Sequence, residues 1–255
     1  MSRRLTPTIL RFDSLPSTNT EAARQAALGA PEGLCVVARE QTAGRGRQQR
    51  EWVSPKDAGL YFSVVLRPRT EVRSWPLITL AAALAVRDAL SESCALEADI
   101  KWPNDLLAGG RKLCGILAET VETPRGSAIV VGIGINLTNH AFPREILGAA
   151  TSIEEQTKQT PDAERLLASL TRALSLRYEM FDDEDGAALV VSVWEANSSF
   201  AHDRRVRVAL NGESFEGVTR GLEPDGALRV ETPDGQMRIV RAGDVMALRR
   251  VISDE

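Results

Sequence analysis

Short apolar runs and helical patterns alternate along the first 200 residues of the chain. Four of the runs are rich in β-branched or other apolar residues and predict buried strands, at residues 34–38, 60–66, 113–121 and 128–137. Turn residues at 124–126 separate the last two runs, so these two strands are expected to form a hairpin.

Helix signals lie between and after these runs. Thr18 followed by Glu21 has the spacing of a capping box and predicts the start of a helix. Three further helices are predicted at residues 75–91, 160–181 and 189–196. Strands and helices therefore share this part of the chain.

Two polar segments interrupt the pattern and are predicted to be loops. Residues 41–55 are rich in glycine and arginine and show no periodicity. Residues 101–110 contain Pro103 and the pair Gly109–Gly110. A loop as long as the first one is usually either functional or disordered when it occurs inside a compact domain.

The pattern changes near Ala201, where short strands begin to alternate with turns. Asn211-Gly212 fits a two-residue hairpin turn, and Pro-Asp-Gly at 224–226 and at 233–235 marks two more turns. This spacing is typical of a small antiparallel barrel of about fifty residues. The domain boundary is therefore predicted at about residue 200.

The composition is that of a soluble globular protein, with 43% hydrophobic and 26% charged residues. The net charge of −4 argues against a general nucleic-acid binder, which needs a basic excess to neutralise phosphates. No segment has the apolar length that spans a bilayer, and the first residues lack the apolar stretch of a signal peptide. The three cysteines form no C-x-x-C pair and suit a reducing compartment, so a cytoplasmic protein without membrane or nucleic-acid partners is expected.

The chain offers few histidines for catalysis. The chain has two histidines, and it contains neither an H-E-x-x-H motif nor a G-x-S-x-G elbow. A hydrolase triad is therefore not expected.

The segment 39–56 carries five cations and two anions, which is a local charge of +3 in an acidic protein. Its glycines allow the backbone to approach a ligand closely. Its arginines are forked donors that match phosphate or carboxylate oxygens. A solvated basic turn is the alternative interpretation.

Three shorter segments carry further candidate groups. Asp105, in the sequence Lys-Trp-Pro-Asn-Asp at 101–105, could hold a magnesium ion or could bond local backbone in an ordinary turn. Lys112 precedes a buried strand, where its ammonium would face a specific group unless it is simply solvated. Gly-Ile-Gly-Ile-Asn at 132–136 indicates a close approach to a backbone or a ligand, and Asn136 could read an adenine or ribose edge.

Taken in order, these segments resemble one family, the biotin–protein ligases, in the short form that lacks an N-terminal DNA-binding domain. Several ordered motifs are far more specific than any single one, and the resemblance runs from about residue 10 to the end. The motifs are Ser-Thr-Asn at 17–19, Gly-Arg-Gly-Arg at 44–47 with Trp52, Lys-Trp-Pro-Asn-Asp at 101–105, Arg-Lys-Leu-Cys-Gly-Ile-Leu at 111–117 and Gly-Ile-Gly-Ile-Asn at 132–136. The chain departs from the family pattern at Gln49, often a glycine, and at Glu51, often basic or neutral.

The resemblance implies an α/β (α+β) fold. A mixed sheet flanked by helices, similar to class II aminoacyl-tRNA synthetases, would be followed by a small SH3-like β-barrel. Residues 1–200 would form the biotin/ATP-binding catalytic domain, and residues 201–255 the barrel. The implied enzyme uses ATP and Mg²⁺ to convert biotin to biotinyl-5′-AMP. It then transfers biotin to a lysine of a biotin carboxyl carrier protein, such as an acetyl-CoA carboxylase subunit, and acts as a monomer or a homodimer.

The resemblance also implies roles for individual residues. The biotin-binding residues would be Ser17, Thr18, Asn19, Gln41, Arg45, Gly46, Arg47, Lys112 and Gly115. The ATP-binding residues would be Arg45, Arg47, Arg50, Trp52, Asn104, Lys112, Asn136 and Arg249. Asp105 would hold the metal, and the catalytic residues would be Lys112, Arg45 and Arg47.

Three other interpretations stay open at this stage. A lipoate ligase shares the architecture, although the Lys-Trp-Pro-Asn-Asp and Gly-Arg-Gly-Arg motifs favour biotin. A nucleic-acid-binding module would use the arginine loop and the barrel, but the net charge of −4 and the 5% of aromatic residues count against it. A biotin-sensing repressor would need a helix-turn-helix, for which the sixteen residues before Ser17 are expected to be too few.

Overall fold

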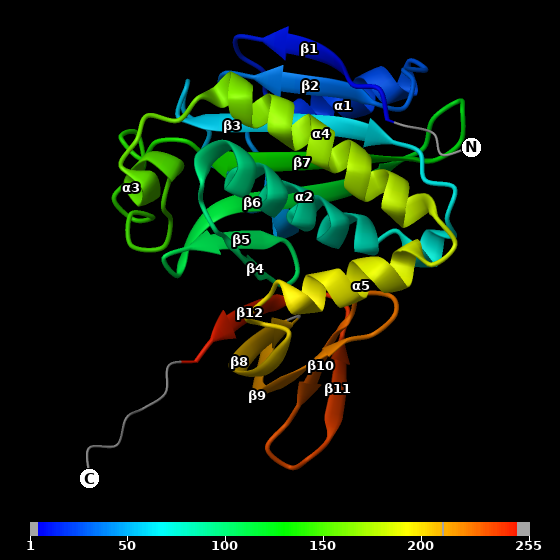
Figure 1. Cartoon of the computed structure of the whole chain (residues 1–255), viewed down its shortest axis with the longest axis vertical. Coiled ribbons are helices and arrows are strands. Elements are labelled where there is room, and N and C mark those ends of the chain that lie inside the picture. Colours follow the sequence, from blue (N-terminus) through cyan, green and yellow to red (C-terminus); the bar gives the residue numbers. More distant parts are fainter. Residues whose placement is uncertain (1–4, 211, 249–255) are drawn as a thin grey trace.

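The computed structural model of the chain describes residues 5–210 and 212–248, and its strands form two sheets (Figure 1). The strands of the larger sheet are β1 (Thr8–Phe12), β2 (Leu34–Ala38), β3 (Gly59–Leu66), β4 (Asp99–Lys101), β5 (Asp105–Ala108), β6 (Arg111–Val121) and β7 (Ala128–Asn136). Their spatial order is β1-β2-β3-β7-β6-β5-β4. β1 and β2 run parallel, and the other neighbours are antiparallel, so the mixed sheet is confirmed.

Helices cover both faces of this sheet (Figure 1). The helices α2 (Leu77–Cys94) and α4 (Ala163–Asp182) pack on each other and share a core with one face of the sheet. The helix α1 (Thr18–Ala27) packs on the opposite face against β2, β3 and β7. The short α3 (Ile153–Thr157) follows β7, and α5 (Gly186–Ala196) packs against α2 and α4.

The strand β2 is buried on both faces, which explains why its sequence is apolar without alternation. Cys35 and Val37 lie in the core shared with α2 and α4. Leu34 and Val36 point the other way, into a second cluster with α1. Successive side chains of a strand face opposite sides of the sheet, so both faces need apolar residues here.

The capping box predicted from Thr18 and Glu21 is wrong. Ser17 is the N-cap of α1, and Ser17 makes no side-chain capping bond. The hydroxyl of Thr18 instead bonds to Gln41, and the carboxylate of Glu21 bonds to Arg24. Tertiary contacts of Thr18 therefore override the local capping pattern.

The prediction of one continuous loop at residues 101–110 is also wrong, because Lys101 ends β4 and residues 105–108 form β5, with short turns at 102–104 and 109–110. The turn between β4 and β5 contains the cis peptide bond Trp102–Pro103. Ile100 and Leu106 are cross-strand partners, and both are fully buried. Burial of this pair stabilises two strands that are too short to show a periodic pattern. The other predicted strands and helices are present, with ends shifted by a few residues.

The smaller sheet has five strands, and all neighbouring pairs are antiparallel, consistent with the expected SH3-like unit. Its strands are β8 (His202–Leu210), β9 (Glu213–Leu222), β10 (Leu228–Glu231), β11 (Met237–Val240) and β12 (Asp244–Ala247). The turns predicted at 224–226 and 233–235 are confirmed, and Gly226 and Gly235 have φ values of 82° and 80°. Asn211, in the turn predicted between β8 and β9, lies outside the described residues.

The smaller sheet lies next to the β4 and β5 edge of the larger one (Figure 1). Trp102 Nε1 donates a hydrogen bond to the carbonyl of Gly226 at 3.0 Å, and the Ser198 hydroxyl donates one to the carbonyl of Ile100 at 2.5 Å. The division of the chain near residue 200 falls between α5 and β8 and stays a prediction.

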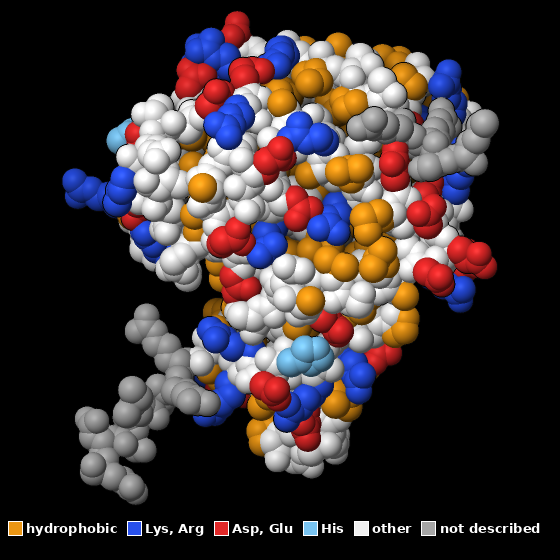
Figure 2. Space-filling view, in the orientation of Figure 1, with side chains coloured by type: hydrophobic (Ala, Val, Ile, Leu, Met, Phe, Trp, Pro, Cys, Tyr) orange, Lys and Arg blue, Asp and Glu red, His pale blue; other side chains and the backbone are white. Residues whose placement is uncertain are grey.

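Charged side chains of both signs are mixed over the face of the molecule seen in Figure 2. Among residues 5–210 and 212–248, no helix combines the length and the apolar character that crossing a membrane requires.

Loss of the α4 cap should destabilise the fold. Asp162 accepts hydrogen bonds from the backbone N–H groups of Glu164 at 3.1 Å and Arg165 at 3.0 Å. Asp162→Ala should lower the free energy of unfolding by about 1 kcal/mol in urea titrations. Asp185 occupies the same position in α5 without a side-chain capping bond, so Asp185→Ala is the matched control and should cost less. Equal losses in the two variants would contradict the assigned cap.

Candidate active site

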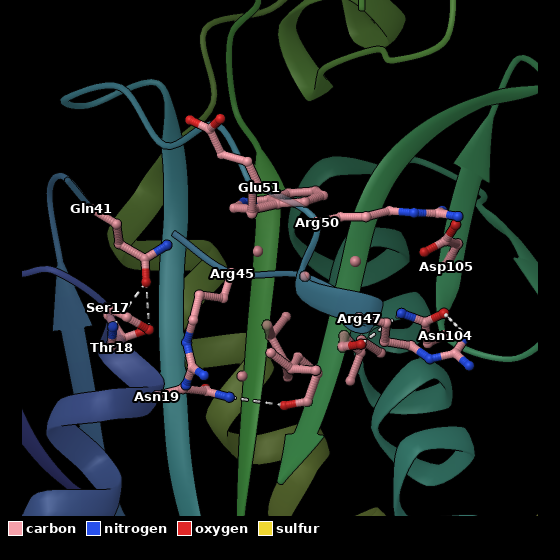
Figure 3. A pocket seen from close by; sticks show the side chains of 18 of the residues that line it. Ser17, Thr18, Asn19, Gln41, Arg45, Arg47, Arg50, Glu51, Asn104 and Asp105 are labelled. Atoms are coloured by element: carbon pink, nitrogen blue, oxygen red, sulfur yellow. Dashed lines mark hydrogen bonds between the residues drawn. The ribbon is translucent and has the colours of Figure 1, made fainter. Parts of the chain in front are cut away.

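A pocket opens on the face of the larger sheet that carries α1, beneath the loop 41–55 (Figure 3). Its walls come from this loop, from the N-terminal end of α1, from β6 and β7, and from the start of β12. The predicted site residues that line it are Ser17, Thr18, Asn19, Gln41, Arg45, Gly46, Arg47, Arg50, Trp52, Asn104, Asp105, Lys112 and Gly115. The fold thus joins groups from distant parts of the chain.

One end of the pocket is built from buried polar side chains (Figure 3). Thr18 donates its N–H to Gln41 Oε1 at 2.9 Å, and its hydroxyl donates to the same oxygen at 3.1 Å. The hydroxyl of Ser63, on β3, lies 2.8 Å from Thr18 Oγ1 and 2.7 Å from Asn19 Oδ1. Hydroxyl and amide groups can both donate and accept, so this end suits a neutral polar ligand.

Glycines on β6 and β7 let side chains of the pocket lie directly against the sheet. A Cβ on Gly134 would lie 2.5 Å from Trp52 Nε1, and a Cβ on Gly132 would lie 2.1 Å from Asn19 Oδ1. A Cβ on Gly115, the partner of Gly134 across the sheet, would lie 3.0 Å from the Trp52 ring. The indole therefore rests directly on the backbone of two strands, which no other residue type would allow.

Glu119, on β6, is a pocket neighbour that the motifs did not identify. Its Oε2 accepts a hydrogen bond from Asn19 Nδ2 at 2.7 Å and one from Arg45 at 3.0 Å. A single carboxylate oxygen therefore connects the polar end of the pocket to the arginine loop. The only sequence signal was an acidic residue late in a strand that was predicted to be buried.

The smaller sheet contributes to the site through β12. Arg47 donates to Asn104 Oδ1 and to the carbonyl of Gly243, both at 3.2 Å, and Arg50 forms an ion pair with Asp244. Burial lowers the pKa of the Arg47 guanidinium, while the nearby charges of Asp244 and Asp105 act in the opposite direction. Asp244 was missed because it lies far from every motif in the sequence.

Lys112 lies between the Trp52 ring and a carboxylate. Its Nζ lies 2.7 Å from Asp105 Oδ1 and 5.2 Å from the centroid of the Trp52 ring. Asp105 Oδ1 is buried, and it accepts no hydrogen bond of good geometry from the described residues even though the ammonium is so near. The contact is an ion pair, and the carboxylate keeps lone pairs for another ligand.

Asp105 fits a magnesium ion better than it fits zinc. Within the described part of the chain, no group of three or more His, Cys, Asp or Glu side chains could hold a metal. Magnesium needs no such cage, because it is commonly bound by one or two carboxylates together with substrate phosphates and water.

Asn136, one of the predicted nucleotide ligands, is not part of the pocket lining. Asn136 donates its amide to the carbonyl of Thr151 at 2.9 Å and to that of Lys112 at 3.4 Å, which holds the start of β6 in place. Its contact with adenosine stays a prediction. Arg249 lies outside the described residues.

Comparison with known proteins assigns the family. The biotin/lipoate A/B protein ligase family matches residues 11–136, and the biotin protein ligase C-terminal domain matches residues 201–246. The chain is 35% identical over 238 residues to the bifunctional ligase/repressor BirA of Bacillus subtilis, covering 92% of this chain and 72% of that protein. This chain belongs to the biotin protein ligase family.

Other family members agree with this assignment. The biotin–[acetyl-CoA-carboxylase] ligase of Paracoccus denitrificans is 36% identical over 236 residues, which are 90% of this chain and 96% of that protein. The biotin protein ligase from Aquifex aeolicus, solved in complex with biotin and ATP, superposes with a TM-score of 0.82 at 26% identity, covering 95% of this chain and 99% of the other.

The contact between Trp52 and the glycines gives a prediction for this biotin protein ligase family member. Gly134→Ala should displace the indole, lower stability by about 1–3 kcal/mol and weaken ATP binding, because the new Cβ overlaps Trp52 Nε1. Gly148→Ala is the control, since a Cβ there meets no atom within 4 Å. Calorimetric ATP titrations and thermal unfolding measure both effects. Unchanged ATP affinity in Gly134→Ala would reject this role for Trp52.

Proposed function

We propose that this protein is a biotin–protein ligase that forms biotinyl-5′-AMP from biotin and ATP and then transfers biotin to a lysine of a biotin carboxyl carrier protein. The observation that carries the proposal is one pocket with a neutral polar end, an arginine loop above it and Lys112 beside Trp52. The carrier would be an acetyl-CoA carboxylase subunit or a similar protein. The three free cysteines suit action in the reducing cytoplasm, by a monomer or a homodimer.

The polar end of the pocket suits the ureido ring of biotin. This ring offers one carbonyl and two N–H groups, and Thr18, Asn19 and Gln41 supply hydroxyl and amide groups that can pair with them. Gly132 of β7 lets the Asn19 amide lie directly against the sheet, from where it would contact the ring. The valeryl chain would then extend toward the loop, which places its carboxylate near Arg45, Arg47 and Lys112.

The first step joins two anions, and the pocket supplies the opposing charge. The biotin carboxylate attacks the α-phosphorus of ATP, and pyrophosphate leaves. Arg45, Arg47 and Lys112 would reduce the repulsion and stabilise the charge that develops on the α-phosphate. Magnesium bound at Asp105 would supply further positive charge for the phosphates.

A covalent enzyme intermediate is not required, and the thiols do not favour one. Burial raises the pKa of Cys35 to about 12 and also raises the pKa of Cys114, so both stay protonated. ATP itself activates the carboxylate. In the second step the carrier lysine, with an ordinary pKa near about 10.4, must lose a proton before it attacks, and Asp105 is a candidate to accept that proton.

The deciding experiment is incubation with biotin, ATP, Mg²⁺ and a biotin carrier domain, followed by intact mass measurement of the carrier. The mass should increase by one biotinyl group only when all components are present. Calorimetry with biotin and with lipoate separates this function from that of a lipoate ligase. Binding of lipoate without binding of biotin would reject the proposal.

Removal of the Lys112 ammonium should affect adenylate formation most. Lys112→Ala should lower the rate of biotinyl-AMP formation by about 100-fold or more, as expected for one preorganised charge at the reacting centre. Lys56→Ala, an exposed lysine just beyond the loop, is the control and should keep the normal rate. A single-turnover assay with labelled ATP measures the step. A near wild-type rate in Lys112→Ala would show that Lys112 has no such role.

Loss of Arg47 should cause the intermediate to leak. The guanidinium holds the loop against Asn104 and Gly243, and Arg47→Gly removes both bonds and adds backbone freedom. Adenylate should still form, because Arg45 and Lys112 remain, but more of it should appear in solution. A quenched, filtered reaction compares free with protein-bound biotinyl-AMP.

Arg47→Lys is the control for this leakage, because it keeps the charge and loses the forked geometry. It should retain more adenylate than the glycine variant. If Arg47→Gly makes adenylate at the normal rate and retains it as long as the wild type, then Arg47 neither closes the loop nor assists the chemistry.

A further inference from the structure

Lys101 lies on the pocket face of the larger sheet, although it is not part of the pocket lining described above. Four residues are paired in a row across β4, β5, β6 and β7. They are Lys101, Asp105, Gly115 and Gly134, in that order. Side chains directly opposite each other in antiparallel strands point to the same face. Trp52 lies on the two glycines, so this row of four residues borders the pocket and Lys101 is at its far end.

The neighbouring row of residues confirms the face of the sheet to which Lys101 points. Ile100, Leu106, Cys114 and Ile135 are paired across the same four strands, and all are fully buried in the core shared with α2 and α4. Successive residues in a strand face opposite sides, so Lys101, which follows Ile100, faces away from this core.

Within residues 5–210 and 212–248, the Lys101 ammonium has no partner of its own. Among the described residues it makes no ion pair and no side-chain hydrogen bond, although it is half-buried. The charges that influence it are those of Asp105, Lys112, Asp244 and Arg50, and burial lowers its pKa. In this group, Asp105 already pairs with Lys112 and Asp244 with Arg50.

We propose that Lys101 is a further substrate-binding residue that contacts the β- and γ-phosphates of ATP, which leave as pyrophosphate. The inference rests on the proposed function. If Trp52 flanks the adenine and Lys112 reaches the α-phosphate, the remaining phosphates extend beyond Asp105 along the row, toward Lys101. Together with Arg47, this corner has four cations and two carboxylates, an excess of positive charge that attracts a polyanion.

The role follows from the balance of the reaction. One oxygen of the biotin carboxylate forms a bond to the α-phosphorus while the bond from that phosphorus to the β-phosphate oxygen breaks. The electron pair of the broken bond leaves on pyrophosphate. The ammonium of Lys101 stabilises this added negative charge and exchanges no proton in the step.

The decisive variant is Lys101→Met, which keeps the length of the side chain and removes its charge. Calorimetric titrations with inorganic pyrophosphate, ATP, AMP and biotin separate the contacts. Pyrophosphate and ATP should bind about tenfold more weakly or worse, as for loss of a charged hydrogen bond, while AMP and biotin keep their affinities. Lys101→Arg should restore most of the pyrophosphate affinity, and Lys56→Met is the control.

Three outcomes overturn the inference. They are unchanged pyrophosphate affinity in Lys101→Met, an equal loss for all four ligands, and no pyrophosphate binding to the wild type. If Lys101→Met does not fold, as judged by thermal unfolding, the same titrations are made with Lys101→Gln. Loss of pyrophosphate binding in a protein that binds no biotin would support the phosphate site and reject the biotin ligase function, so the two proposals are tested separately.

Discussion

The close approach of Trp52 to the sheet is the constraint on which the site depends. The indole rests on the backbone of β6 and β7 because Gly115 and Gly134 have no side chains, and a Cβ at Gly134 would overlap its Nε1. Two residues earlier along β7, Gly132 lets the Asn19 side chain lie equally close to the backbone of the strand. Glycine loses more conformational entropy on folding than other residues do, so these glycines weaken the strands that contain them. Their positions fix where the Trp52 indole and the Asn19 amide lie.

Three arginines hold the loop above that surface, each through a different partner. Arg45 pairs with Glu119 of β6, Arg47 donates to Asn104 and to Gly243, and Arg50 pairs with Asp244 of β12. Two of these contacts reach the smaller sheet, so the carboxyl-terminal unit takes part in positioning the loop. Exposed ion pairs are individually weak, typically below about 1 kcal/mol, so a ligand with stronger charge can replace them. The contacts that order the loop are therefore ones that the phosphate or carboxylate of a ligand can replace.

The chemistry that this arrangement supports depends on fixed charge. Buried thiols with raised pKa values and the shortage of histidines leave few nucleophiles, whereas Arg47, Lys112 and Asp105 converge at one end of the pocket. Cations that are already positioned need little reorganisation when charge develops on a phosphate. The ammonium of Lys101, which has no ion-pair partner in the described part of the chain, extends this charge beyond Asp105. The larger sheet thus acts as a rigid scaffold that sets the spacing of groups from four neighbouring strands.

Sequence patterns alone determined the long apolar strands, the main helices, the turns of the smaller sheet and the ordered motifs that mark the family, because these depend on periodicity and on short local signals. Only the tertiary structure decided the rest. The short strands β4 and β5 form through the buried pair Ile100–Leu106, and the Thr18 hydroxyl bonds to Gln41 instead of capping the helix. Glu119 and Asp244 join the site by contacts across the chain, and Lys101 faces the pocket by cross-strand register. Such pairings depend on residues far apart in the chain, and no local pattern records them.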